Sequence, residues 1–203
     1  KADAQLLSTE GKVFLLSFLR THDPFSTRRL TVFITSKKSC SVTLQSADGS
    51  FRQNVSVTTA STTVVDVTMA VYTDTNEVVF LKGLYIQATD TINVYASNKV
   101  PAIMDMTKVI PLTSLGSDYL ILAYANPKGS VGTAGVAISQ FMIVCVEDDT
   151  EVELFPTSPS PAGPPNTPLV VTPHTGQPDL YDANTDFHGS RRKDKGLTEI
   201  AYW

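Results

Sequence analysis

The segment Thr91-Ile92-Asn93-Val94-Tyr95 alternates aliphatic residues with polar or aromatic ones, so Ile92 and Val94 share one face of an extended chain. A two-residue period is typical of a β-strand that has one face in the core and one in solvent. Residues 150–154 show the same alternation, with two glutamates on the polar face. Half-buried strands of this kind favour an antiparallel sheet.

The same theme recurs between Lys12 and Phe155, as short strand-forming runs closed by turn residues. Thr, Val and Ile supply 55 of the 203 residues, and these β-branched side chains favour strands over helices. The pattern predicts an all-β fold, specifically an antiparallel β-sandwich in a domain of residues 1–155. The predicted strands are residues 12–20, 29–35, 40–45, 51–58, 63–68, 77–81, 84–88, 91–96, 118–124, 137–146 and 150–154.

Two details refine this prediction. Residues 141–146 are apolar on both faces, so we expect this strand to be central and covered on both sides. Turn residues separate the other strands, among them Thr89-Asp90 and the acidic group at residues 147–149. The parity of Cys40 with Val42 places the Cys40 thiol on an inward face.

The character of the chain changes at Pro156. Residues 156–178 hold 8 of the 12 prolines, and proline removes ladder donors, so we expect an extended arm that acts as a linker. Residues 179–203 form a short polar C-terminal segment, too small to fold alone.

Composition excludes some classes of function. A net charge of −4 argues against nucleic-acid binding, which needs a basic face. No apolar run approaches the length of a membrane span. Two cysteines are too few for a zinc cluster, and they form either one disulfide or two buried thiols.

Three phrases, together with Gly11 and the apolar run after it, resemble the N-terminal domain family of the IgG-Fc-binding protein. The resemblance covers roughly residues 11–155, in order. The phrases are Lys82-Gly83-Leu84-Tyr85-Ile86-Gln87-Ala88 continuing into residues 91–98, Ile110-Pro111-Leu112-Thr113-Ser114-Leu115-Gly116-Ser117-Asp118-Tyr119, and Glu147-Asp148-Asp149-Thr150-Glu151-Val152-Glu153-Leu154.

The resemblance implies a secreted, β-rich module of mucus-like, adhesive or matrix proteins, and it supplies no catalytic residues. From it we expect a non-enzymatic, extracellular structural or adhesive domain whose partners are other extracellular proteins or copies of itself. In an oxidising compartment, we predict a disulfide between Cys40 and Cys145. Asn54-Val55-Ser56 is a glycosylation sequon, and its strand parity predicts an exposed acceptor at Asn54.

The motifs for catalytic and metal-binding sites are incomplete in this sequence. The three histidines, His22, His174 and His188, lie in a loop, the arm and the tail, and no nucleophile motif accompanies them. Asp182, Asn184 and Asp186 have the spacing of half a calcium loop, but the glycine and closing glutamate of such a loop are missing, which favours a solvated turn. We therefore predict no catalytic residue, no metal site and no cofactor.

The last residues are candidates for partner binding. Ile200, Tyr202 and Trp203 end a strand-like segment that could add to the sheet of a neighbouring copy, insert Trp203 into a pocket, or pack back on its own domain. The alternative function is a carbohydrate-binding, lectin-like module. Such a site needs an exposed aromatic residue, for which Tyr72 and Tyr124 are the candidates.

Overall fold

The computed structural model describes residues 8–19, 27–73, 81–101, 103–119, 139–147, 150–154, 169–171, 178–183, 190–192 and 198–202. Within these ranges the regular structure is β-strand, apart from two single-turn 3-10 helices, η1 (Met69–Val71) and η2 (Leu112–Ser114). The all-β prediction is confirmed. None of the described helices is long and apolar enough to cross a membrane.

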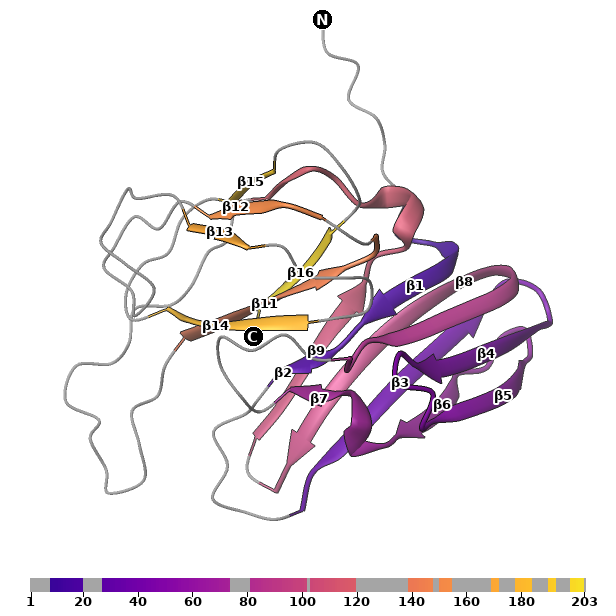
Figure 1. Cartoon of the computed structure of the whole chain (residues 1–203). Helices are drawn as coiled ribbons and strands as arrows, with labels where there is room; N and C mark the ends of the chain where they lie inside the picture. Colours follow the sequence, from indigo (N-terminus) through magenta and orange to yellow (C-terminus); the bar gives the residue numbers. More distant parts are fainter. Residues whose placement is uncertain are drawn as a thin grey trace, which may run out of the picture.

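The largest element is an antiparallel sheet of seven strands (Figure 1). Its members are β1 (Gly11–Leu16), β3 (Arg29–Ser36), β4 (Cys40–Ser46), β5 (Arg52–Val57), β6 (Thr63–Val67), β8 (Leu84–Val100) and β9 (Ile103–Val109).

Strand β8 organises this sheet, because its two parts have different neighbours. Its first part, from Leu84 to Ala88, lies between β4 and β1, whereas its second part, from Ile92 onward, lies between β3 and β9. The predicted turn at Thr89-Asp90 is therefore wrong, since the strand continues through these residues. The segment before these residues pairs with β4 and the segment after them pairs with β3, so the long-range pairing of both segments outweighs the local turn preference of Asp90.

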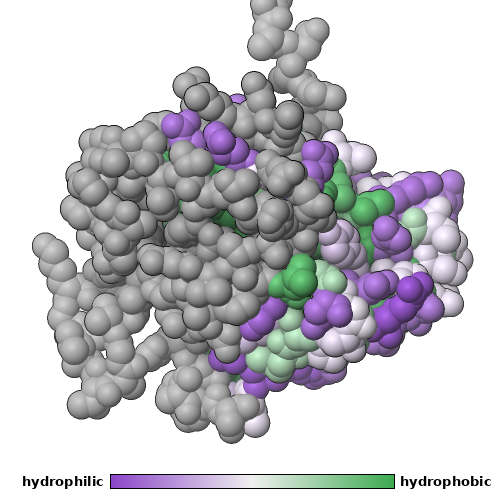
Figure 2. Space-filling model, viewed as in Figure 1, coloured by the Kyte–Doolittle hydropathy of each residue, from purple (hydrophilic) through white to green (hydrophobic). Residues whose placement is uncertain are grey.

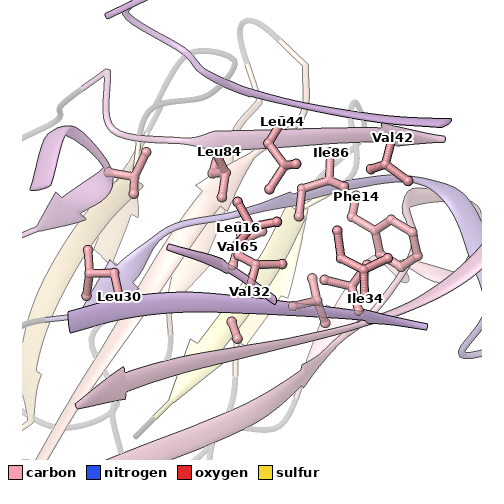
Figure 3. Packing of buried hydrophobic residues seen from close by; sticks show 14 of the residues in the cluster. Phe14, Leu16, Leu30, Val32, Ile34, Val42, Leu44, Val65, Leu84 and Ile86 are labelled. Atoms are coloured by element: carbon pink, nitrogen blue, oxygen red, sulfur yellow. The ribbon is translucent and has the colours of Figure 1, made fainter. Parts of the chain in front are cut away.

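The sheet forms two layers that face each other across one hydrophobic core. One layer contains β4, β5 and the first part of β8, and the other contains β3, β6 and the second part of β8. Figure 3 shows Val42 and Leu44 pointing from one layer toward Val32 and Ile34 of the other. Strands β5 and β6, at the two ends of the strand order, also approach each other, so the sheet is nearly closed. The two layers thus belong to one curled sheet joined through β8, instead of to the two separate sheets expected for a sandwich.

A second, smaller core lies on the outer side of β1. Strand β11 (Ser139–Cys145) pairs with β14 (Pro178–Ala183) on one side and β16 (Thr198–Tyr202) on the other. Met142 and Val144 of β11 pack with Leu15 and with Leu19, which belongs to β2 (Phe18–Leu19). Strand β2 pairs in parallel with β7 (Tyr72–Thr73). All described side chains of β11 are buried, as its apolar sequence predicts for a central strand.

The boundaries predicted after Phe155 need correction. Strand β12 (Val152–Leu154) pairs with β13 (Leu169–Val171) from the predicted arm and with β15 (Ser190–Arg192) from the predicted tail, and β10 (Asp118–Tyr119) adds beside β15. The arm contributes a strand because Leu169-Val170-Val171 is an apolar, proline-free run at the edge of its sheet, where neighbouring prolines are tolerated. Residues 156–203 therefore contribute strands to the same fold.

Two further features were missed or fall outside the description. Strand β9 was not predicted from the sequence, because Asp105 and Lys108 interrupt its apolar pattern. Most of the predicted strand 77–81, and the predicted strand 118–124 beyond Tyr119, lie outside the described residues.

A Cβ atom on Gly11 would collide with the Pro111 ring, so this glycine allows β1 and the segment before η2 to pack closely.

Candidate functional site

The outer face of the layer formed by β4, β5 and the first part of β8 carries a row of polar side chains. Thr43 lies opposite Asn54 on β5 and opposite Gln87 on β8, and Gln45 lies opposite Arg52 and Tyr85 in the same way. The inward neighbours on these strands are aliphatic and buried, so alternation alone turns the polar residues outward. We call this surface the amide face, consisting of Thr43, Gln45, Arg52, Asn54, Tyr85 and Gln87. In Figure 2 the molecular surface over β4 and β5 is hydrophilic to neutral.

A shallow pocket opens on the amide face. It has a volume of about 180 Å³ and is lined by Thr43, Gln45, Tyr85 and Gln87. Tyr85 is half-buried, because it packs against the second core beside Leu15. One wall of the pocket is therefore the Tyr85 side chain, which also packs against the second core. The other walls are polar side chains of β4 and β8.

Hydrogen bonds fix two of the polar groups. The Thr43 hydroxyl donates to Asn54 Oδ1 over 2.8 Å, and Arg52 Nη1 donates to Gln45 Oε1 over 3.1 Å. Both bonds run toward β5, away from β8. As a result, the amide nitrogen of Gln45 is left as a donor on the pocket side, and the Thr43 oxygen retains acceptor capacity.

The outer face of the layer formed by β3, β6, β9 and the second part of β8 is more apolar than the amide face. Val64, Phe33 and Tyr95 lie side by side on β6, β3 and β8, and Met104 and Met106 follow on β9. Val64 is 52% exposed, Tyr95 37%, Met104 52% and Met106 49%. We call these five residues the apolar face. Large exposed apolar residues that cluster in this way mark interaction surfaces more often than scattered ones do.

Basic groups border the apolar face. Lys108 lies 5.5 Å from the centroid of the Tyr95 ring, and Lys99 lies beside Met104 in the strand register. Arg29 also borders this face, but it donates two hydrogen bonds, of 2.8 and 2.7 Å, to the carboxylate of Asp66. These bonds hold the pKa of Asp66 below its usual value. Lys99 and Lys108 thus place positive charge beside the apolar face, and the Glu10 carboxylate, which accepts hydrogen bonds from Lys37 and Asn93, lies near enough to Lys108 for their charges to interact.

The predicted glycosylation acceptor, Asn54, is exposed on β5, as its strand parity indicated. Its Oδ1 atom is engaged by Thr43, which leaves the Nδ2 atom, where a glycan would attach, without a hydrogen bond to the described residues. Attachment of a glycan stays a prediction. Because Asn54 belongs to the amide face, a glycan there would extend over the neighbouring pocket.

The predicted disulfide between Cys40 and Cys145 is not formed in the structure, where Cys40 carries a free thiol. Cys40 begins β4, opposite Val57, and packs against the main core. Cys145 is buried at the end of β11, in a different sheet, opposite Thr198. The inward parity of Cys40 was therefore a sound expectation, but both thiols serve as small core side chains in separate sheets.

The predicted partner-binding segment pairs within its own chain. In strand β16, Ile200 lies opposite Ile143 and Tyr202 lies opposite Phe141. The segment therefore packs back on its own domain, which is one of the three alternatives given above. The expectation that a linker holds it away from the domain is wrong. Trp203 lies outside the described residues.

The other candidates are also placed or left outside the description. Tyr72 is buried, with the Arg28 guanidinium 3.9 Å from its ring centroid, so it is not the exposed aromatic residue that a lectin site needs. Tyr124, the three histidines, Asn184 and Asp186 lie outside the described residues, and Asp182 lies in β14 opposite Gln140. Within the described ranges, no group of three or more potential ligands could hold a metal ion.

Sequence reasoning missed the pocket and the apolar face. A signal for the pocket was present, since Thr43, Gln45, Tyr85 and Gln87 all occupy the outward parity of two predicted strands. What the sequence lacked was the register that places β4 beside the first part of β8. The apolar face depends on β9, which was not predicted.

A scan against protein-family models, a search of curated proteins and a search of solved structures each found no match for this chain. The resemblance to the N-terminal domain family of the IgG-Fc-binding protein therefore stays a prediction.

Proposed function

We propose that this protein is a secreted, non-enzymatic structural or adhesive module that binds another extracellular protein through its apolar face. The observation that carries the proposal is the cluster of Val64, Tyr95, Met104 and Met106, each more than a third exposed, on the outer side of the seven-stranded sheet. Methionine and tyrosine side chains suit protein interfaces, because they offer a large contact area. The extracellular setting rests on the family resemblance.

The charge around the apolar face supports a partner of a particular kind. Lys99 and Lys108 border the face, while the two described carboxylates beside it are already paired, Asp66 with Arg29 and Glu10 with Lys37. Two copies docked through this face would bring lysines together. We therefore propose a different protein as the partner, with an apolar surface bordered by carboxylates.

The test compares two matched substitutions of exposed methionines. Met106→Glu places a carboxylate within the apolar face, whereas Met69→Glu changes a methionine of similar exposure that lies outside it, in η1. The two variants and the unsubstituted chain are each probed against an array of purified extracellular domains. Each binder is then confirmed by calorimetry at two salt concentrations. Thermal melts confirm that both variants fold.

We expect a binder whose affinity falls about tenfold or more with Met106→Glu, stays unchanged with Met69→Glu, and weakens with salt. The proposal is overturned if no array member binds or if Met106→Glu leaves every binder unaffected. It is also overturned if light scattering shows that the chain forms a dimer that Met106→Glu dissociates, because the occupant of the face is then a second copy.

A further inference from the structure

We propose that the pocket on the amide face binds one uncharged sugar residue of a glycan. The pocket lies on the half of the sheet formed by β4 and the first part of β8, so it is a site separate from the apolar face. Its volume of about 180 Å³ suits a single pyranose ring better than an extended chain. The inference thus adds a second ligand class to the proposed protein-binding function.

The polar groups of the pocket complement sugar hydroxyls. Each hydroxyl of a pyranose both donates and accepts hydrogen bonds, so its site must offer both kinds of group in close succession. Gln45 offers its amide nitrogen as a donor, because its oxygen already accepts from Arg52. Thr43 offers its oxygen as an acceptor, because its proton is given to Asn54. Gln87 is exposed and offers both a donor and an acceptor.

These groups are held in place before a ligand arrives. Thr43 and Gln45 are partly buried on β4, and their bonds to β5 fix the rotation of the Thr43 hydroxyl and of the Gln45 amide. A site on strands, with its side chains restrained by neighbours, loses little conformational entropy on binding. This restraint distinguishes the pocket from an ordinary polar strand surface.

Tyr85 supplies the apolar wall. A pyranose ring has a face made of C–H groups, and such a face packs well on an aromatic ring. Tyr85 is half-buried and anchored against Leu15 in the second core, so its position is determined by packing on the side away from solvent. An aromatic wall beside amide and hydroxyl groups is the combination expected for a sugar site.

The described lining residues are uncharged, and this bears on the class of sugar. None of the four lining residues is ionisable near neutral pH, and the nearest cation on the face, Arg52, is bonded to Gln45. These four side chains therefore offer no salt bridge to the carboxylate of an acidic sugar. A neutral hexose or an N-acetylhexosamine fits this chemistry best.

The experiment uses the full chain, expressed without N-glycosylation so that Asn54 carries no glycan over the pocket. Galactose, glucose, mannose and N-acetylglucosamine are titrated separately while amide and side-chain NMR signals are followed, and a glycan array then extends the series. Gln87→Ala removes an exposed pocket group, and Gln53→Ala is the matched control, since Gln53 is an exposed glutamine of β5 on the opposite side of the strand. Melting curves confirm that both variants fold.

We expect at least one neutral sugar to shift the signals of Thr43, Gln45 and Gln87, with an affinity that falls about tenfold in Gln87→Ala and is unchanged in Gln53→Ala. The proposal is overturned if no sugar binds, or if binding is the same in Gln87→Ala as in the unsubstituted protein. It is equally overturned if an extended peptide occupies the pocket and sugars do not. Met106→Glu leaves sugar binding intact, so failure of this proposal is distinguishable from failure of the protein-binding function.

Discussion

Ile86 offers the most direct test of the sheet. Its side chain is fully buried and lies opposite Phe14 on β1 and Leu44 on β4, at the centre of the main core. Ile86→Ala removes about three carbon groups, each worth about 0.8 kcal/mol of transfer free energy. The cavity left between the two layers adds to this loss, so we expect the free energy of unfolding to fall by about 3 to 4 kcal/mol.

The measurement is a urea titration followed by far-ultraviolet circular dichroism, with two controls. Ile86→Val removes one carbon group, and we expect a loss of about 1 kcal/mol. Gln87→Ala changes the next residue, which faces solvent, and we expect a change within about 0.5 kcal/mol. If Gln87→Ala costs as much as Ile86→Ala, the strand faces the opposite way and the register described for β8 is refuted.

Four other predictions address separate contacts. Gly11→Ala forces a methyl group against Pro111, so we expect the urea midpoint to fall by an amount equivalent to about 1 to 3 kcal/mol; an unchanged midpoint contradicts this close approach. The lowered pKa of Asp66 means that its pairing with Arg29 stabilises the fold above the usual carboxyl pKa of about 4 and that this contribution is lost as the pH falls through the lowered pKa. Asp66→Asn is therefore expected to flatten the dependence of unfolding free energy on pH below about 4; profiles parallel to that of the unsubstituted protein would argue against this role. Intact mass after alkylation in denaturant, without reductant, is expected to show a modified Cys40, and its absence would indicate a disulfide. Deleting the residues of β16 removes one neighbour of β11, so we expect a lower melting temperature, whereas an unchanged melt would mean that this pairing does not stabilise the fold.

Several features of the protein followed from the sequence by itself. The two-residue period assigns each strand residue to a face, and the structure buries Val42 and Leu44 and exposes Asn54 as that period predicts. The two-sided apolar pattern of residues 141–146 likewise predicted a strand covered on both faces. These features could be predicted because strand geometry makes the direction of a side chain a local property.

Other features were decided only by the tertiary structure, because they depend on hydrogen-bond partners that are distant in the sequence. Thr89 and Asp90 have the local preference of a turn, but they stay extended within β8 because the residues before them pair with β4 and the residues after them pair with β3. Leu169–Val171 and Thr198–Tyr202 become strands because β12 and β11 offer them edges. The two candidate sites have the same origin. The pocket and the apolar face each collect residues from strands whose neighbours are chosen by register and core packing, and no local pattern encodes that choice.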